Sequence, residues 1–273
     1  MPRKSMKGSW SFITLLIIPI VVGQCKSYVP QGSLLRNDSI LWTPTLIIDS
    51  CIVEHQYEGN ESETLKRIEL TGNIQAVPQW SFAITPSLEE VLLSSDIKTI
   101  GDNAFFSCKK LTKINLSHIE SFGENCFKLS NLEEVDLSSA IKVGEFAFAN
   151  CPNLRKVEFS NDLDDIGDFA FWGDSALCGC SIPAGKIGAC AFMGCVNLEW
   201  LLLGQVESIG DASFLGCVSL KSVVVPASVK VIGREAFLGC KSLKEVTING
   251  SETQIANDAF EKDVIINYVE NEE

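Results

Sequence analysis

The chain has 273 residues, and 46% of them are hydrophobic, which is enough to bury a large core. Its 35 acidic and 22 basic side chains give a net charge of −13, and the basic ones are scattered, so we expect no nucleic-acid partner. The two histidines, His55 and His118, have no nucleophile or acid spaced around them. We therefore expect no catalytic residues, no cofactor and no metal ion.

Residues 1–23 have the pattern of a secretory signal peptide. Three basic residues precede a mostly apolar stretch over residues 10–22, and small residues lie before a cleavage point after Gly23. An uncleaved signal anchor would need about 18 to 20 apolar residues, more than this stretch offers. We expect a secreted or cell-surface chain with no transmembrane anchor in its mature form.

Residues 24–64 precede the repeats and are expected to form an N-terminal cap. Cys25 and Cys51 are a candidate disulfide there, since the first open edge of a repeat protein needs protection. His55 also falls in this region. Tripeptides that accept N-linked glycans in a eukaryotic secretory pathway occur at Asn37, Asn60 and Asn249, and at Asn115, which falls in a predicted strand.

A pattern of about 22 residues recurs over residues 65–266: Ile-Gly-x-x-Ala-Phe-x-x-Cys-x-x-Leu-x-x-Ile-x-Leu. The clearest copy begins at Ile100, and the next ones follow at steps of 22, 21, 23, 21, 22 and 23 residues. Those copies begin at Phe122, Val143, Ile166, Ile187, Ile209 and Ile232, with weaker copies at Val77 and Ile255. This period, with one Leu-x-x-Ile-x-Leu strand in each copy, is typical of a leucine-rich-repeat solenoid, whose stacked repeats form the core together.

The repeats predict an α/β solenoid, wound as a right-handed superhelix with a parallel β-sheet on one face. The Ala-Phe pair is expected in a short helical turn, and the glycine before it in a tight bend with positive φ. The phenylalanines should stack as an internal column: Phe105, Phe127, Phe148, Phe171, Phe192, Phe214, Phe237 and Phe260. A polar tail over residues 267–273 follows the solenoid.

The cysteines follow the repeat and do not suggest a small disulfide scaffold. A shared inward position predicts free, buried thiols at Cys108, Cys151, Cys195, Cys217 and Cys240, and Cys126 and Cys180 replace other core residues. Cys178 and Cys190 are expected near the surface, as a second disulfide or as exposed thiols. Cys178-Gly179-Cys180 lacks the further ligands of a zinc site.

Three copies carry a specific resemblance: Ile100–Leu111 (IGDNAFFSCKKL), Ile187–Leu198 (IGACAFMGCVNL) and Ile232–Leu243 (IGREAFLGCKSL). The chain resembles the BspA-like leucine-rich-repeat family of secreted and surface proteins of bacteria and protozoan parasites. Asp174 departs from the pattern in place of a cysteine, and Leu129 or Ser130 takes that position in the copy at Phe122. The resemblance implies an extracellular binding role, typically adhesion to host cells, matrix or other microbes, and no catalytic residues.

Strand alternation predicts which side chains face outward on the parallel sheet. Trp200, Leu202 and Val224 should form an exposed apolar cluster beside the small residues Gly179 and Ser181. Glu134, Asp136 and Glu158 should form an acidic patch several strands away. A register shifted by one residue would instead turn Trp200 inward, and an acidic patch can serve solubility alone. His118 is expected in a solvated loop.

These features favour a protein that binds other proteins through its repeat face, with adhesion to a host cell-surface or matrix protein as the leading hypothesis. The alternatives are a soluble inhibitor or decoy, and a structural coat protein that associates with itself.

Overall fold

The structure is a computed structural model that describes residues 27–29, 45–48, 51–57, 65–71 and 74–269. The predicted signal peptide, Cys25, Asn37 and Asn60 lie outside these residues.

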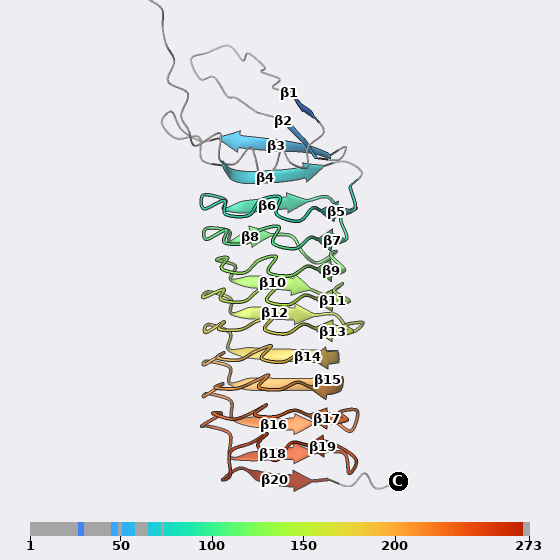
Figure 1. The fold of residues 1–273 in the computed structure, drawn as a ribbon, viewed down its shortest axis with the longest axis vertical. Coiled ribbons are helices and arrows are strands. Elements are labelled where there is room, and N and C mark those ends of the chain that lie inside the picture. Colours follow the sequence, from blue (N-terminus) through green and yellow to red (C-terminus); the bar gives the residue numbers. More distant parts are fainter. Residues whose placement is uncertain (1–26, 30–44, 49–50, 58–64, 72–73, 270–273) are drawn as a thin grey trace, which may run out of the picture.

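From Leu65 onward the chain winds into a parallel β-solenoid of about nine turns, which rise one above the other along its long axis (Figure 1). Each turn contributes a strand to a broad face, because its Leu-x-x-Ile-x-Leu segment alternates inward apolar residues with outward ones. The strands of the broad face are β4 (Leu65–Thr71), β6 (Glu90–Leu93), β8 (Lys113–Ile114), β10 (Glu134–Leu137), β12 (Lys156–Phe159), β14 (Gly179–Ile187), β15 (Trp200–Ile209), β16 (Ser222–Val225), β18 (Glu245–Ile248) and β20 (Ile265–Tyr268).

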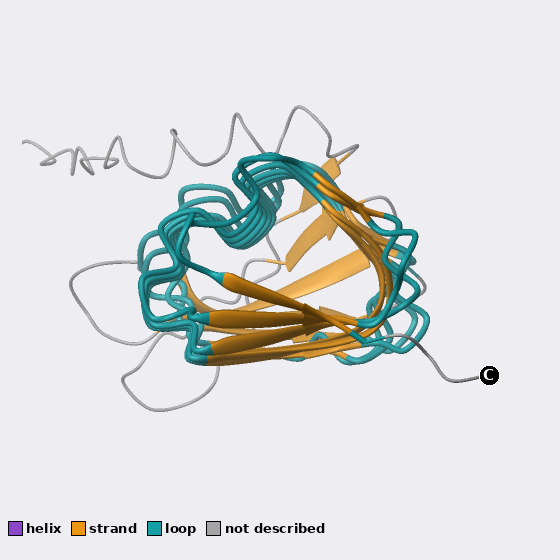
Figure 2. Cartoon of the chain, turned by 90° about the horizontal axis from the view of Figure 1, so that it is seen from below, coloured by secondary structure: helices purple, strands orange, loops and turns teal. Residues whose placement is uncertain are grey.

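A second, narrower ladder of parallel strands runs beside the broad face, at the Ile-Gly position of each repeat. It comprises β5 (Ala76–Val77), β7 (Thr99–Ile100), β9 (Ser121–Phe122), β11 (Lys142–Val143), β13 (Asp165–Ile166), β17 (Val231–Ile232), β19 (Gln254–Ile255) and the second halves of β14 and β15. Seen along the long axis, the turns superimpose, with strands on two sides of the outline and loops on the others (Figure 2).

Three further strands precede the solenoid: β1 (Ser27–Val29), β2 (Thr45–Ile48) and β3 (Cys51–Tyr57). They pair antiparallel in chain order, and β3 pairs antiparallel with β4. Since β4 pairs parallel with β6, β3 occupies the sheet edge that the first repeat strand would otherwise expose.

The predicted phenylalanine column is present and includes one more ring, that of Phe82. Consecutive rings stack nearly parallel, with centroids 5.1–5.3 Å apart from Phe82 to Phe260. Because each interior ring contacts the ring above and the ring below, a repeat without its phenylalanine would leave two neighbours unpacked.

The helical part of the fold prediction is not confirmed, because the described residues form strands and turns without a helix. The Ala-Phe segments are turns in which the fourth residue of the motif has positive φ, as at Asn103 (58°), Phe146 (53°) and Phe169 (57°). A left-handed residue at this position interrupts the run of right-handed dihedrals that an α-helix needs.

The prediction that the glycine before each Ala-Phe pair adopts a positive φ is also wrong. In the described repeats, the glycine at the second position of the motif does not have positive φ; Gly101 and Gly188 are examples. A Cβ at Gly101 would instead lie 2.7 Å from the Val77 carbonyl oxygen of the preceding turn. Close approach of two backbones, and not backbone conformation, requires glycine at this position.

The cysteine column is free and buried, as predicted, and it also makes hydrogen bonds. Each thiol of the column donates to the phenylalanine carbonyl of the preceding turn at 3.2–3.3 Å; the thiols are those of Cys108, Cys151, Cys195, Cys217 and Cys240. Burial raises the pKa of the Cys195 and Cys217 thiols well above the usual value, which keeps them protonated donors. Cys126 and Cys180 are buried and free as well.

Asp174 interrupts this column. It is fully buried; Oδ1 accepts the backbone N–H of Cys151 at 2.7 Å, whereas Oδ2 is buried without a hydrogen-bond partner. Burial raises the pKa of this carboxyl well above its usual value. In the copy at Phe122, Ser130 takes the cysteine position, and its hydroxyl lies 3.2 Å from the Cys151 sulfur.

Candidate binding face

The outward positions of the broad face are charged at one end and uncharged in the middle. Neighbouring strands pair in register, so Glu134 lies beside Lys156, Gly179 beside Trp200, and Ser222 beside Glu245. The outward residues from β4 to β12 are Arg67, Glu69, Glu90, Leu92, Lys113, Asn115, Glu134, Asp136, Lys156 and Glu158. Those of β14, β15 and β16 are Gly179, Ser181, Trp200, Leu202, Ser222 and Val224, without a charge among them.

The apolar cluster predicted on this uncharged stretch faces outward. Trp200, Leu202 and Val224 are 49%, 61% and 51% exposed, whereas the alternate residues Leu201 and Val223 are buried. The register is therefore the one that places Trp200 on the surface. We refer to Trp200, Leu202 and Val224 as the apolar cluster.

Trp200 does not project straight into solvent. A Cβ built on Gly179 would lie 1.8 Å from Cε2 of the Trp200 indole, so the ring lies flat over the glycine of the neighbouring strand. Gly179 is consequently buried, although its position in the strand faces outward. The absence of a side chain at residue 179 is what allows the indole to lean toward β12.

The indole forms one wall of a shallow, open groove of about 650 Å³ that crosses β10, β12, β14 and β15. Its other lining residues include Glu134, Lys156 and Glu158 on the charged strands, with Gly179 and Ser181 between them and Trp200. The acidic patch and the apolar cluster were expected several strands apart, as separate features. Glu134 and Glu158 of the acidic patch and Trp200 of the apolar cluster line one groove, because the strand between them carries only small outward residues.

The groove also contains residues that the repeat pattern did not single out: Arg155, Asn161 and Pro183. Arg155 lies one residue before β12, and Asn161 and Pro183 lie beyond the alternating part of their strands, where periodicity no longer assigns a face. No sequence signal marks them as partners of Trp200.

Two ion pairs partly neutralise the charged side of the groove. Lys156 pairs with Glu158 on its own strand, and Arg155 pairs with Glu133 of the preceding turn. The hydrogen bond and charge of Glu158, followed by the charges of Glu134 and Asp136, raise the pKa of Lys156. The local field is thus negative, since Glu134 and Asp136 still act on an ammonium that already has a partner.

The remaining predicted surface cysteines are free. Cys178 is exposed in the groove, where its thiol lies 3.7 Å from the Arg155 carbonyl oxygen, and Cys190 is partly exposed. The second disulfide proposed for this pair is absent. Of the N-terminal pair, Cys51 lies in β3, and Cys25 falls outside the described ranges.

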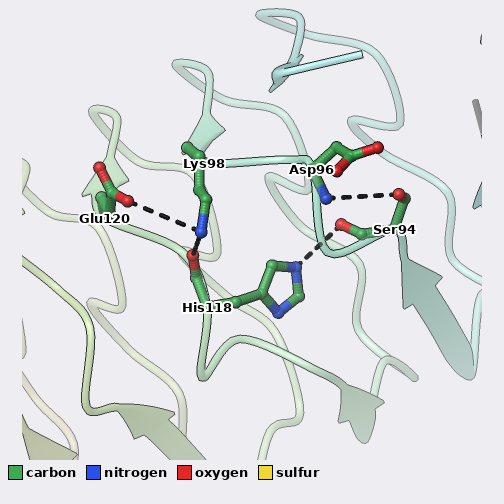
Figure 3. A network of polar contacts seen from close by, with 5 residues as sticks. All are labelled: Ser94, Asp96, Lys98, His118 and Glu120. Carbon is green, nitrogen blue, oxygen red and sulfur yellow. Dashed lines mark hydrogen bonds and ion pairs between the residues drawn. The ribbon is translucent and has the colours of Figure 1, made fainter. Parts of the chain in front are cut away.

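His118 is more embedded than a solvated loop residue. Its Nε2 lies 3.0 Å from the Ser94 carbonyl oxygen, and its own carbonyl accepts a hydrogen bond from Lys98 at 3.2 Å (Figure 3). Lys98 also lies 3.6 Å from a Glu120 carboxylate oxygen. These contacts join neighbouring turns at a corner of the solenoid, so His118 has a structural role.

Two of the glycan acceptor sequences lie in described residues. Asn249 directly follows β18, is partly exposed, and donates its backbone N–H to Val225. Asn115 lies one residue beyond β8, and not within it. Its side-chain amide makes two hydrogen bonds to the backbone of Leu93, at 2.7 and 2.9 Å, which holds it against β6.

Within the described part of the chain, no cluster of three metal-binding side chains occurs. A membrane-spanning helix is likewise absent from the residues that the structure covers.

Comparison with known proteins gives one family and several similar folds. A family model described as a BspA type leucine rich repeat region, in six copies, matches residues 55–178 and 180–272. A search of the curated proteins finds no significant match.

The comparison with solved structures finds three similar chains among others, and the first of them shows the similarity of fold. A leucine-rich repeat protein from Bacteroides ovatus is 19% identical, with a TM-score of 0.54 over 82% of this chain and 71% of its own. A leucine rich cell surface protein from Faecalibacterium prausnitzii is 16% identical, with a TM-score of 0.31 over 87% and 97%. The pneumococcal vaccine antigen PcpA is 15% identical, with a TM-score of 0.33 over 91% and 89%.

Proposed function

The chain belongs to the BspA type leucine-rich-repeat family, and from this and the broad face we propose that it is a secreted or cell-surface protein that binds other proteins. The proposed role is adhesion to a host cell-surface or matrix protein, or to another microbe. The secretory pattern of residues 1–23 supports an extracellular location.

The uncharged window across β14, β15 and β16 is the observation that carries this proposal. Three large apolar side chains are about half exposed there, on a face whose neighbouring strands carry charges. Exposed apolar clusters bounded by polar residues mark protein-binding sites, and tryptophan is enriched among residues that dominate binding energy. A surface maintained only for solubility would carry charges at these positions, as β10 and β12 do.

Binding of the purified chain to live host cells and to immobilised matrix proteins tests the proposal. We expect saturable binding that falls at least ten-fold when Trp200 and Leu202 are both replaced by alanine. Trp80→Ala is the matched control, because Trp80 is 44% exposed on the turn side of the solenoid. Failure of the chain to bind any cell or matrix protein would reject adhesion, and self-association at rising concentration would favour a coat role.

A further inference from the structure

We propose that the groove between the acidic patch and Trp200 binds an extended, cationic peptide segment, with one apolar side chain on the apolar cluster and a lysine or arginine facing Glu134 and Asp136. This inference rests on the proposed protein-binding function and specifies the chemistry of the partner.

The charge of the groove defines the sign of the ligand. Glu133, Glu134, Asp136 and Glu158 lie on or beside β10 and β12, whereas Arg155 and Lys156 are the cations there. Both cations are in ion pairs, with Glu133 and Glu158 respectively. Glu134 lines the groove, and Asp136, two residues along the same strand, adds negative charge beside it while one of its oxygens accepts the Ser138 backbone N–H at 3.0 Å. This charge attracts a cation and repels an acidic segment.

Trp200 supplies the second contact. One face of its indole lies against Gly179, and its side chain remains 49% exposed. Leu202, two residues further along the same face of β15, is 61% exposed, so an aliphatic or aromatic side chain can bury area against both. This apolar extension favours a peptide over a neutral glycan, whose hydroxyl groups would need polar partners at the same place.

Distances across the sheet define the spacing within the ligand. From β10 to β15 there are three strand intervals, about 14 Å at 4.8 Å each. An extended peptide advances about 3.3 Å per residue, so four residues span about 13 Å, and residues i and i+4 face the same side. The predicted segment therefore has a basic residue four positions away from its apolar anchor.

Three nine-residue peptides in a glycine-serine background provide the test, each immobilised on a biosensor with the purified chain as analyte. The first has lysine and leucine four residues apart, the second has glutamate in place of that lysine, and the third has lysine and leucine adjacent. At low salt we expect the first to bind at least ten-fold more tightly than the second and at least three-fold more tightly than the third. Raising the salt to 0.5 M should reduce the first difference, because screening weakens the attraction.

Variants separate the two contacts. Trp200→Ala should weaken binding of the first peptide at least five-fold, and the control Trp80→Ala should leave it unchanged. The pair Glu134→Gln and Asp136→Asn should weaken it similarly, whereas Glu145→Gln with Glu252→Gln, which removes two exposed carboxylates outside the groove, should not. Lys156→Gln should strengthen it about three-fold, because Glu158 then loses its internal partner.

Several outcomes would overturn the inference: equal binding of the lysine and glutamate peptides, no binding of any peptide at 1 mM chain, or weaker binding by the Lys156 variant. Binding of neutral oligosaccharides that depends on Trp200, without peptide binding, would assign the groove to a glycan. If cell binding needs Trp200 and Leu202 while the peptides fail, the proposed function stands and the partner chemistry is wrong. If the lysine peptide binds but cells and matrix do not, the groove inference stands and adhesion fails.

Discussion

Inside the solenoid, a phenylalanine ring takes the same position in nine consecutive turns, from Phe82 to Phe260. On the broad face, the outward positions of the same turns change from charged on β10 and β12 to uncharged on β14 to β16. An interior ring contacts the turns above and below, so any change in one repeat is felt by two others. An outward side chain has solvent on one side, which leaves its identity free to vary with function.

The largest expected effect comes from breaking the interior. Phe171→Ala should reduce the free energy of unfolding by about 3–5 kcal/mol, because it leaves a cavity and removes stacking on both sides. The ring of Phe171 lies 5.3 Å from that of Phe148 and 5.1 Å from that of Phe192. Urea unfolding followed by circular dichroism measures the change.

Phe106→Ala is the matched control for this substitution, since Phe106 is partly exposed and contacts Trp80 edge to face. It should shift the urea midpoint much less. Equal shifts for the two variants would contradict the view that the interior column stabilises the solenoid.

A smaller change in the free energy of unfolding, of opposite sign, is expected at Asp174, which interrupts the cysteine column. Asp174→Cys should raise the free energy of unfolding at pH 7 by about 1–3 kcal/mol, because removing a buried carboxyl with an unpartnered oxygen outweighs the loss of the acceptor for the Cys151 backbone N–H. The new thiol would restore the donor that the other turns direct at a phenylalanine carbonyl. Thermal or urea unfolding of the two proteins at one pH gives the difference.

The same site predicts a pH dependence. Burial raises the pKa of Asp174 in the folded chain above its value in the unfolded chain, so the folded state holds the proton more tightly. The resulting stabilisation is complete below the unfolded pKa of about 4 and is lost as the pH rises through the folded pKa. Asp174→Asn should remove this loss, whereas Asp162→Asn, on the surface, should retain it. A wild-type profile that rises over the same range after correction for the other carboxyls would contradict the assignment.

The interior could be predicted from the sequence, because a residue type that recurs about every 22 residues occupies the same position in each turn. Phe171, Cys195 and the burial of their columns follow from that periodicity. It does not report backbone dihedrals, so the left-handed residues at Asn103 and Phe146 were missed and a helical turn was expected instead.

The groove could be predicted only in part. Alternation along the strands identified Trp200, Glu134 and Glu158 as outward residues. The direction in which the indole leans depends on its rotamer and on the space above Gly179, which are tertiary properties. Joining the two patches therefore required the structure.

The smallest expected effect on stability tests whether the outward residues of the broad face can change without affecting the interior of the solenoid. Replacing both Trp200 and Leu202 by alanine should change the free energy of unfolding by less than about 1 kcal/mol, because both side chains are about half exposed or more. The same double variant should lose at least ten-fold in binding to cells or matrix. Leu201→Ala, on the same strand but buried, is the control and should lower stability by about 2 kcal/mol or more. If the double variant instead lost more than about 2 kcal/mol of unfolding free energy, Trp200 and Leu202 would belong to the core. The distinction between a repeated interior and a variable outward face would then fail on β15, the strand that contributes most to the proposed binding site.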